Sequence, residues 1–487
     1  MNRTRIFPFL ALALAALVAG CATNPASKNP EFVLMSEAEE LKLGQQMAAD
    51  VEKNLTLLAD DDPLNIYVEK VGQRVAKTAD RTDLFFHFQV VDDSTINAFA
   101  LPGGFVYIHR GLIDHLDSEA ELAAVLGHEI GHITARHAVK QYTKAQGYQM
   151  GMVVASIFVP GVWAVSPFSD LFAMILIRGY GRDAEFQSDE LSLEYIRRAG
   201  YDVHATANIL KTLERLDAID QRVKKEAGEK TQAYHGAFAT HPETKKRIEE
   251  AIAKVAAEQG TTGEVNREGF LAMLDGQPYA NSSKEGAVID HRFIHPKLDF
   301  ALNFSERWSI HNGQQLLTAR VKQQEVYFQL SFKKLQKRHT AAEILASLFK
   351  KRHTGPIGEG EQDGFRFAQA EVEESAPHVS YAKILATVYL DGDKCYATML
   401  WSKRDEFDAN RADFLTLAKS FRHYDKARDG DVLHIQRYVW KSGDSWPKLA
   451  AESKNVLGSF TTDRLAAMNG YDPDVNPPAG TPIKIVR

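Results

Sequence analysis

The stretch GHEIGHITARH, residues 127–137, places three histidines and a glutamate within eleven positions. It follows Ser118-x-x-Glu121, a pattern typical of a helix start, so it is expected to continue an apolar helix. Residues four apart lie about 40° apart around a helix. His128 and His132 therefore project from one face and can share a tetrahedral ion, with Glu129 close enough to contact a water there. The stretch predicts half of a zinc site.

His137 is expected to contact neighbouring groups rather than to bind the ion. On an ideal helix it lies about 140° round from His132, and no glycine between them turns the chain. The alternative for the whole stretch is a helix with two incidental histidines. Val125, Leu126 and Ile130 make this helix apolar, and two unpaired histidines would be costly to bury there.

The remaining metal ligand must be His, Asp or Glu. The chain has two cysteines, Cys21 and Cys395, which excludes a zinc site built from thiolates and a disulfide framework. Glu185 in GRDAEFQSDELSLEYI is the best candidate third ligand. Asp189 follows four residues later on the same helix face, where it is expected to accept the free ring N–H of a ligand histidine. The alternative for both carboxylates is a solvated acidic helix face.

The N-terminus predicts export and a lipid anchor. MNRTR is followed by a run of 13 apolar residues and then by Val18-Ala19-Gly20-Cys21. This segment resembles a bacterial lipoprotein signal, residues 1–20, with Cys21 as the lipidated residue. A spanning helix is the alternative, but the run is too short. Ala22 after the cysteine, by resemblance to enterobacterial lipoproteins, suggests the outer membrane, and the net charge of −6 makes nucleic acid an unexpected partner.

The rest of the chain is expected to form a multidomain α+β protein. Boundaries are predicted at 21–280, 285–425 and 430–487, with a Ser/Asn-rich stretch at 280–284 between the first two. The first region should hold helices from Ser36, over 63–79, 183–198, 205–216 and 243–258, and strands over 85–91 and on both sides of Pro102-Gly103-Gly104. Residues 150–177 are nearly uncharged but are split by two prolines, so they predict an apolar hairpin over the site or, alternatively, a segment that dips into a membrane.

A family resemblance rests on three stretches in chain order: INAFALPGGFVYIHRGL, then HEIGH, then EFQSD. In these stretches the chain resembles metallopeptidase family forty-eight, which includes the heat-shock membrane protease HtpX and the CAAX prenyl endopeptidases. The resemblance covers roughly residues 31–275. It implies a mainly helical zincin-type (gluzincin) domain with one zinc ion per chain, ligands His128, His132 and Glu185, and Glu129 as the catalytic acid/base. Ser188 departs from the alanine of many relatives. Membrane-embedded relatives carry spanning helices where this chain has 150–177, so a periplasm-facing, lipid-tethered form is expected.

Further site residues are expected around this core. The family shares an HPxTxxR pattern, which His241, Pro242, Thr244 and Arg247 match. His241 is then a catalytic helper at the oxyanion, a mobile fourth ligand or a local helix cap. Arg182 is expected to be an oxyanion donor or an ion-pair partner, and Arg247 is expected to contact the metal ligands without binding the ion. An edge strand that includes Asn97, Ala98 and Phe99 is expected to bind substrate by strand addition, unless it belongs to an ordinary core hairpin.

The C-terminal region, with YVxxxGDS, LAAMNG and GTPIKIV, resembles a LysM-like βααβ module, of a kind that commonly binds peptidoglycan. A lengthened middle, SKNVLGSFTT, leaves a packing role open. The middle region resembles a PsbP-like α/β layout. The chain is therefore expected to be a zinc endopeptidase of the bacterial envelope that acts on unfolded or misassembled proteins. A non-catalytic adaptor or chaperone that binds peptidoglycan, and a hydrolase of peptidoglycan cross-links, are the alternatives.

Overall fold

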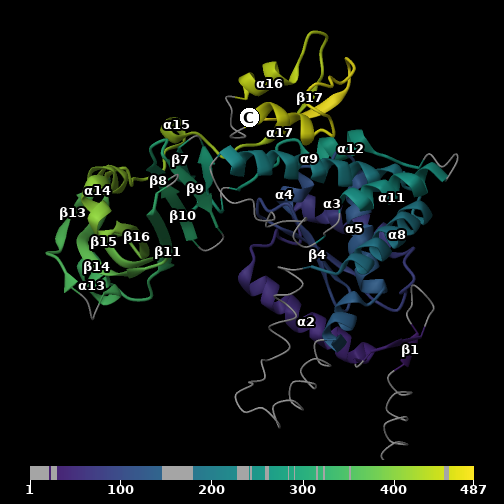
Figure 1. Cartoon of the computed structure of the whole chain (residues 1–487), viewed down its shortest axis with the longest axis horizontal. Coiled ribbons are helices and arrows are strands. Elements are labelled where there is room, and N and C mark those ends of the chain that lie inside the picture. The colour runs from purple at the N-terminus through teal and green to yellow at the C-terminus, as the bar shows by residue number, and fades with distance from the viewer. Residues whose placement is uncertain are drawn as a thin grey trace, which may run out of the picture.

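The computed structural model describes residues 21–23, 30–33, 35–144, 179–226, 241, 244–257, 263–282, 284–289, 291–313, 316–321, 324–349, 353–453 and 460–487. The predicted hairpin at 150–177 and the signal peptide at 1–20 lie outside these residues. Three assemblies follow one another along the chain: a mainly helical domain, a sheet-rich domain to one side of it, and a small unit that lies on the helical domain (Figure 1). The architecture is mixed α and β with several sheets, as expected.

The helical domain surrounds α5 (Glu119–Thr134), the helix that carries His128 and His132. Its other helices are α2 (Glu37–Asn54), α3 (Pro63–Ala76), α4 (Arg110–Ile113), α8 (Arg182–Arg198), α9 (His204–Glu226), α11 (Thr244–Ala257) and α12 (Arg267–Leu274). The strands are β1 (Cys21–Thr23), β2 (Pro30–Phe32), β3 (His87–Val91), β4 (Ala98–Leu101) and β5 (Phe105–His109). The predicted helices are present, but α3 ends before residue 79, α9 continues to Glu226, and the sequence patterns did not predict α12.

Capping residues fix where these helices begin. Ser36 and Glu39 form the full reciprocal capping box at α2, and Asp62 caps α3 ahead of Pro63. At α5 the expected box is only half formed. Ser118 accepts the Glu121 backbone N–H, whereas the Glu121 carboxylate accepts from the backbone N–H of Asp117.

A three-stranded sheet in the order β3-β5-β4 lies beside α5, with β3 parallel and β4 antiparallel to β5. The β4–β5 hairpin confirms the predicted pair of strands around Pro102-Gly103-Gly104. Gly103 and Gly104 have φ angles of +79° and +104°, which L-residues with side chains rarely adopt. Since β4 ends the sheet, one of its edges has no strand partner among the described residues.

Helices α5 and α8 cross closely because small residues face each other. A Cβ on Gly131 would lie 2.7 Å from Ser188 Oγ, and one on Gly127 would lie 3.0 Å from Ser192 Oγ. The two hydroxyls also tie the helices together: Ser192 Oγ donates to the carbonyl of Ala124 at 2.8 Å, and Ser188 Oγ donates to that of His128. This crossing brings the first turns of α8 against the paired histidines.

The sheet-rich domain contains an eight-stranded antiparallel sheet in the order β12-β14-β15-β16-β11-β10-β9, with β13 paired to β14, and a three-stranded sheet in the order β6-β7-β8. Helix α14 (Arg404–Lys419) packs on one face of the larger sheet and α13 (Ala341–Leu348) on the other. The remaining elements are β6 (Ala287–Ile289), β7 (Arg292–His295), β8 (Phe300–Asn303), β9 (Trp308–Asn312), β10 (Leu316–Val321), β11 (Val326–Lys334), β12 (His353–Thr354), β13 (Gly358–Gln362), β14 (Phe365–Ala376), β15 (Val379–Asp391), β16 (Lys394–Lys403) and α15 (Lys426–Asp429).

The C-terminal unit has the expected βααβ order: β17 (Ile435–Val439), α16 (Trp446–Glu452), α17 (Thr461–Ala467) and β18 (Pro482–Val486). Its apolar residues are continuous with the core of the helical domain, so the two do not have separate cores. Figure 1 shows α17 beside α9. Three ion pairs join α9 to this unit: Arg215–Asp472, Arg222–Asp463 and Asp220–Arg464, at 2.6, 2.6 and 2.8 Å.

Lys484 of β18 reaches into the helical domain, where its ammonium group donates to the carbonyl oxygens of Asp114, at 3.0 Å, and Leu116. These carbonyls follow α4 and directly precede the cap of α5. The C-terminal unit is therefore anchored beside the start of α5. Within the described ranges, no helix is both long and apolar enough to cross a membrane.

Candidate metal centre

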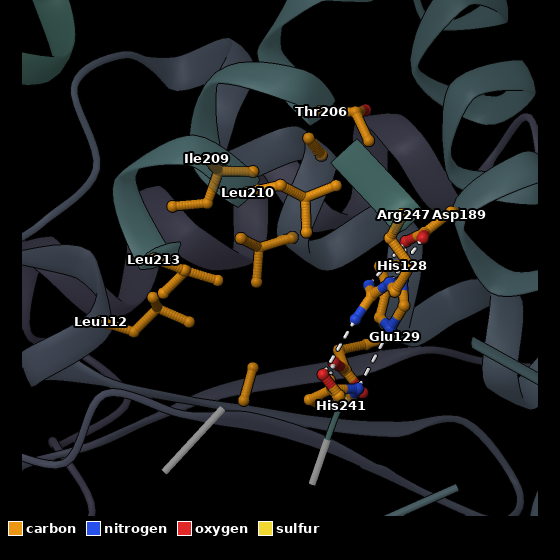
Figure 2. A pocket seen from close by; sticks show the side chains of 13 residues that line it. Leu112, His128, Glu129, Asp189, Thr206, Ile209, Leu210, Leu213, His241 and Arg247 are labelled. Atoms are coloured by element: carbon orange, nitrogen blue, oxygen red, sulfur yellow. Dashed lines mark hydrogen bonds and ion pairs between the residues drawn. The ribbon is translucent and has the colours of Figure 1, made fainter. Parts of the chain in front are cut away.

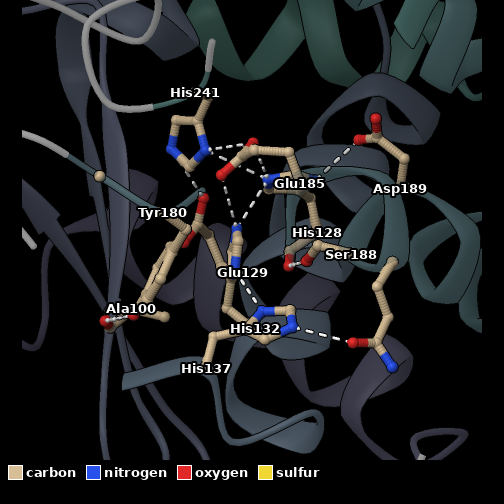
Figure 3. Close-up of polar contacts among 12 residues, drawn as sticks. Ala100, His128, Glu129, His132, His137, Tyr180, Glu185, Ser188, Asp189 and His241 are labelled. Atoms are coloured by element: carbon tan, nitrogen blue, oxygen red, sulfur yellow. Dashed lines mark hydrogen bonds and ion pairs between the residues drawn. The ribbon is translucent and has the colours of Figure 1, made fainter. Parts of the chain in front are cut away.

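Four side chains from three segments converge at the crossing of α5 and α8 (Figure 3). His128 and His132 come from α5, Glu185 from the first turn of α8, and His241 from the residues before α11. One ligand atom from each lies within 4.8 Å of all the others. Glu185 is fully buried, which is unusual for a carboxylate without a bound cation or a full set of partners.

The distances between these atoms fit a tetrahedral ion. Nε2 of His128 lies 3.0 Å from Nε2 of His132, 3.4 Å from Oε2 of Glu185 and 3.2 Å from Nδ1 of His241. Nitrogen ligands about 2.0–2.1 Å from zinc at tetrahedral angles would be separated by about 3.3–3.4 Å. Oε1 of Glu185 is also buried and has no hydrogen-bond partner among the described residues. The donor set therefore fits a metal ion.

Asp189 and Arg247 support His128. Nδ1 of His128 lies 2.9 Å from Oδ1 of Asp189, which directs Nε2 towards the other ligands. Arg247 of α11 donates to both oxygens of Asp189, at 2.6 and 2.7 Å, and lies 3.1 Å from Glu185. Burial lowers the pKa of His128, but hydrogen bonds with Asp189 and Glu185 outweigh this effect and raise that pKa to about 9. The His128 ring is thus held beside two carboxylates, at a position that is suited to a cation.

His137 contacts His132, so the prediction from an ideal helix that it faces elsewhere is wrong. Helix α5 ends at Thr134, and Arg136 has a φ of +56°, so the chain turns back. Nδ1 of His137 then lies 2.7 Å from Nδ1 of His132, and its Nε2 lies 3.0 Å from Oε1 of Gln187. The expectation that it contacts neighbouring groups holds, because it provides an acceptor for the ring N–H that a metal-binding His132 must carry on Nδ1.

Glu129 is buried beside these side chains, and burial raises the pKa of its carboxyl group. Its Oε1 lies 3.7 Å from Nε2 of His241, and its Oε2 has no hydrogen-bond partner within the described ranges. A carboxylate with a raised pKa and a free oxygen is suited to accept and return a proton. This is the position that the sequence predicted for it.

Tyr180 is a site residue that the sequence reasoning missed. Its ring stacks on His132 with centroids 4.1 Å apart, and its hydroxyl group donates to the carbonyl of Ala100 in β4 at 3.5 Å. It therefore connects a ligand ring to the edge strand. Its place directly before α8, in RGYGRDAE, was the available signal, but an isolated tyrosine in a loop carries no pattern.

The other predicted site residues lie at varied positions. Ala98, the first residue of β4, lines a pocket next to His128 and Glu129, whereas Phe99 stacks on Tyr107 in the core. Asn97 is buried just before β4. Arg182 is exposed at the first residue of α8. Substrate binding by the strand residues and a role for Arg182 stay predictions.

A helix with His-Glu-x-x-His crossed by a second helix that supplies a buried glutamate is the arrangement of a metallopeptidase centre. Comparison with known proteins agrees. Residues 64–255 match the family described as Peptidase family M48, so this part of the chain is an M48 peptidase domain. The sequence-based resemblance is thereby confirmed for this region.

Named relatives match part of the chain. "Mitochondrial metalloendopeptidase OMA1" of Schizosaccharomyces pombe is 33% identical over 218 residues, which cover 43% of this chain and 60% of that protein. "Beta-barrel assembly-enhancing protease" of Yersinia pestis is 28% identical over 187 residues, which cover 37% of this chain and 38% of that protein. The match thus spans between 38% and 60% of these relatives' lengths. The solution structure of a cyanobacterial PsbP from Synechocystis aligns with a TM-score of 0.23 over 28% of this chain and 95% of that one, at 14% identity, which is too low to support an inference.

Proposed function

We propose that this protein is a zinc-dependent endopeptidase, with His128, His132 and Glu185 as the metal ligands. The observation that carries the proposal is the set of buried donor atoms 3.0–3.5 Å apart with Glu129 directly beside them. Zinc is the ion of choice for two imidazoles and one carboxylate at tetrahedral spacing. The relatives named as metalloendopeptidases and proteases support the same reaction.

Each side chain has a defined part in peptide hydrolysis. When bound, zinc supplies Lewis-acid polarisation of the substrate carbonyl and eases the deprotonation of water. Glu129 takes the proton of the attacking water on its free oxygen and delivers it to the nitrogen of the leaving amine. Asp189 and His137 keep protons on Nδ1 of His128 and His132, which would leave both Nε2 lone pairs free to hold the ion.

His241 accounts for the fourth ligand position at rest. Its Nδ1 lies 2.9 Å from Glu185 and 3.2 Å from His128, within the donor set rather than at a distance from it. Its carbonyl accepts from Arg247 at 3.2 Å, which links its position to α11. We propose that His241 withdraws when substrate enters; the alternative role is donation to the developing oxyanion.

The cellular setting is part of the proposal. The relatives named for β-barrel assembly, together with the lipoprotein-like N-terminus, support a protease of the bacterial envelope that is anchored through Cys21 and faces the periplasm, at the outer membrane. Unfolded or misassembled envelope proteins are the proposed substrates. Peptidoglycan is a proposed partner of the C-terminal unit. A purely binding role has less support, because an adaptor has no need of a buried Glu129 beside three ligands.

The test is cleavage of an unfolded polypeptide by the zinc-loaded protein and by Glu129→Gln. The variant is expected to lose about 10²–10⁴-fold in rate, because it cannot move the proton. Equal rates for both proteins would overturn the mechanism, and cleavage of cross-linked muropeptides alone would favour the cell-wall alternative. Glu185→Ala is expected to lose its metal in elemental analysis, and full retention would remove Glu185 from the ligand set.

A further inference from the structure

An apolar pocket opens beside the catalytic carboxylate. Figure 2 shows it between α5 and α9, with Glu129, His128 and His241 at one end. Its walls are aliphatic: Leu112, Ala124, Val125, Ile209, Leu210 and Leu213. Among its polar lining groups, Arg247 donates to Asp189 and to the His241 carbonyl, whereas Oε2 of Glu129 and Oγ1 of Thr206 have no hydrogen-bond partner among the described residues. No charged group along the aliphatic walls would attract a charged ligand.

The pocket lies on the leaving-group side of the reacting bond. Glu129 must reach the amine nitrogen of the residue that follows the scissile bond. Val125 precedes Glu129 by one helical turn, so the pocket extends from Glu129 towards the start of α5. A substrate strand added antiparallel to β4 would run from Leu101 towards Ala98, which lines the pocket. Both relationships place the side chain after the scissile bond in this space.

The size of the pocket limits what can enter. It has a cavity volume of about 60 Å³, counted as space open to the centre of a water molecule. One water needs roughly 10–15 Å³ on that measure, so the pocket holds about four to six water-sized groups. Leucine, isoleucine and methionine side chains have about four non-hydrogen atoms, whereas phenylalanine has about seven and tryptophan about ten. An unbranched or branched aliphatic chain fills the space, and an aromatic ring exceeds it.

We propose that this pocket makes the enzyme select leucine, isoleucine or methionine directly after the scissile bond, over alanine, charged and aromatic residues. The inference rests on the proposed peptidase activity. Since such residues are buried in folded proteins, a requirement for one in extended form restricts cleavage to chains whose apolar segments are exposed. The pocket thus gives unfolded substrates a physical basis for recognition.

Quenched fluorescent peptides that differ only at the position after the expected scissile bond test the preference. The zinc-loaded protein is expected to cleave the leucine peptide at least about tenfold more efficiently, in kcat/KM, than the alanine, aspartate and phenylalanine peptides. Equal kcat/KM for all four peptides, with every rate abolished by Glu129→Gln, would overturn the pocket inference while the peptidase proposal stands.

Leu213→Ala tests whether Leu213 limits the size of the side chain that the pocket accepts. Leu213 is only partly buried, so its truncation enlarges the pocket with little loss of core packing. This variant is expected to gain about tenfold for phenylalanine relative to leucine. Leu84→Ala is the matched control, because Leu84 is also partly buried against the same core but does not line the pocket. An unchanged profile in Leu213→Ala, or the same change in Leu84→Ala, contradicts the assignment.

Measurements of peptide binding distinguish side-chain recognition by the pocket from peptide hydrolysis. Short peptides that begin with leucine, alanine or phenylalanine mimic the leaving fragment, and their affinity for zinc-loaded Glu129→Gln is measured by calorimetry. The leucine peptide is expected to bind about tenfold more tightly, and this preference should disappear in Glu129→Gln/Leu213→Ala. A leucine preference in binding without any cleavage by the unsubstituted protein would sink the peptidase proposal alone. No preference in binding overturns the pocket.

Discussion

Nδ1 of His241 lies 2.9 Å from Oε2 of Glu185, so a side chain from the residues before α11 stands among the donors of α5 and α8. As the proposed fourth ligand, His241 would compete with water and substrate for the metal.

His241→Ala is expected to increase kcat/KM for short peptides. If the open state accounts for about a tenth of the resting molecules, the gain is on the order of tenfold. His204→Ala, an exposed histidine on α9, is the control. A fall of about 10²-fold in His241→Ala would instead assign His241 to the oxyanion alone.

His137→Leu is expected to weaken metal binding by about 10–100-fold, because His132 loses the acceptor for its Nδ1–H. Competition with a fluorescent zinc chelator measures the change. His204→Leu serves again as the exposed control. Unchanged affinity in His137→Leu would mean that the 2.7 Å contact does not orient His132.

Gly131→Ala is expected to destabilise the protein by about 1–3 kcal/mol, since its new Cβ would lie 2.7 Å from Ser188 Oγ. Removing that hydroxyl should relieve the clash. The loss of melting temperature caused by Gly131→Ala is therefore expected to be smaller on a Ser188→Ala background. Equal losses on both backgrounds would show that α8 moves away as a whole.

Lys484→Met is expected to cost about 2–5 kcal/mol, because the carbonyls of Asp114 and Leu116 lose their buried donor. Burial lowers the pKa of Lys484 to about 8, so the group is still largely charged at neutral pH. Thermal unfolding compared with Lys441→Met, an exposed lysine of the same unit, measures the difference. Equal melting temperatures would argue against anchoring through Lys484.

Glu285 is expected to make stability depend on pH. Burial, with the charges of Asp93 and Asp92, raises its pKa from 4.5 to about 8. Between these values the folded state keeps a proton that the unfolded state has lost, so the free energy of unfolding decreases as pH rises through this window. Glu285→Gln should remove this component. Urea titrations from pH 4.5 to 8 with Glu359→Gln as the exposed control measure it, and parallel curves for Glu285→Gln and the unsubstituted protein would contradict the shift.

Local patterns predicted much of the helical domain. The caps at Ser36 and Asp62 and the repeat of apolar residues depend on neighbours within one or two turns, which is why α2, α3 and α5 begin where expected. His137 shows the limit of such reasoning. The prediction for His137 assumed that α5 continues, whereas the chain turns back at Arg136. The resulting contact between His137 and His132 depends on packing rather than on spacing in the sequence.

The sequence by itself determined that His128 and His132 share a face with Glu129 between them, because the period of the helix fixes that geometry without any tertiary contact. Only the tertiary structure decided how the centre is completed. Asp189 contacts His128 across 61 positions, through a helix crossing that the small residues Gly131 and Ser188 allow. His241 contacts His128 across 113 positions, from the residues before α11. The aliphatic pocket is likewise made by side chains of α5 and α9 together with Leu112 of α4, segments that are separated in the sequence. Contacts between distant segments depend on how whole surfaces fit together, which no local pattern encodes.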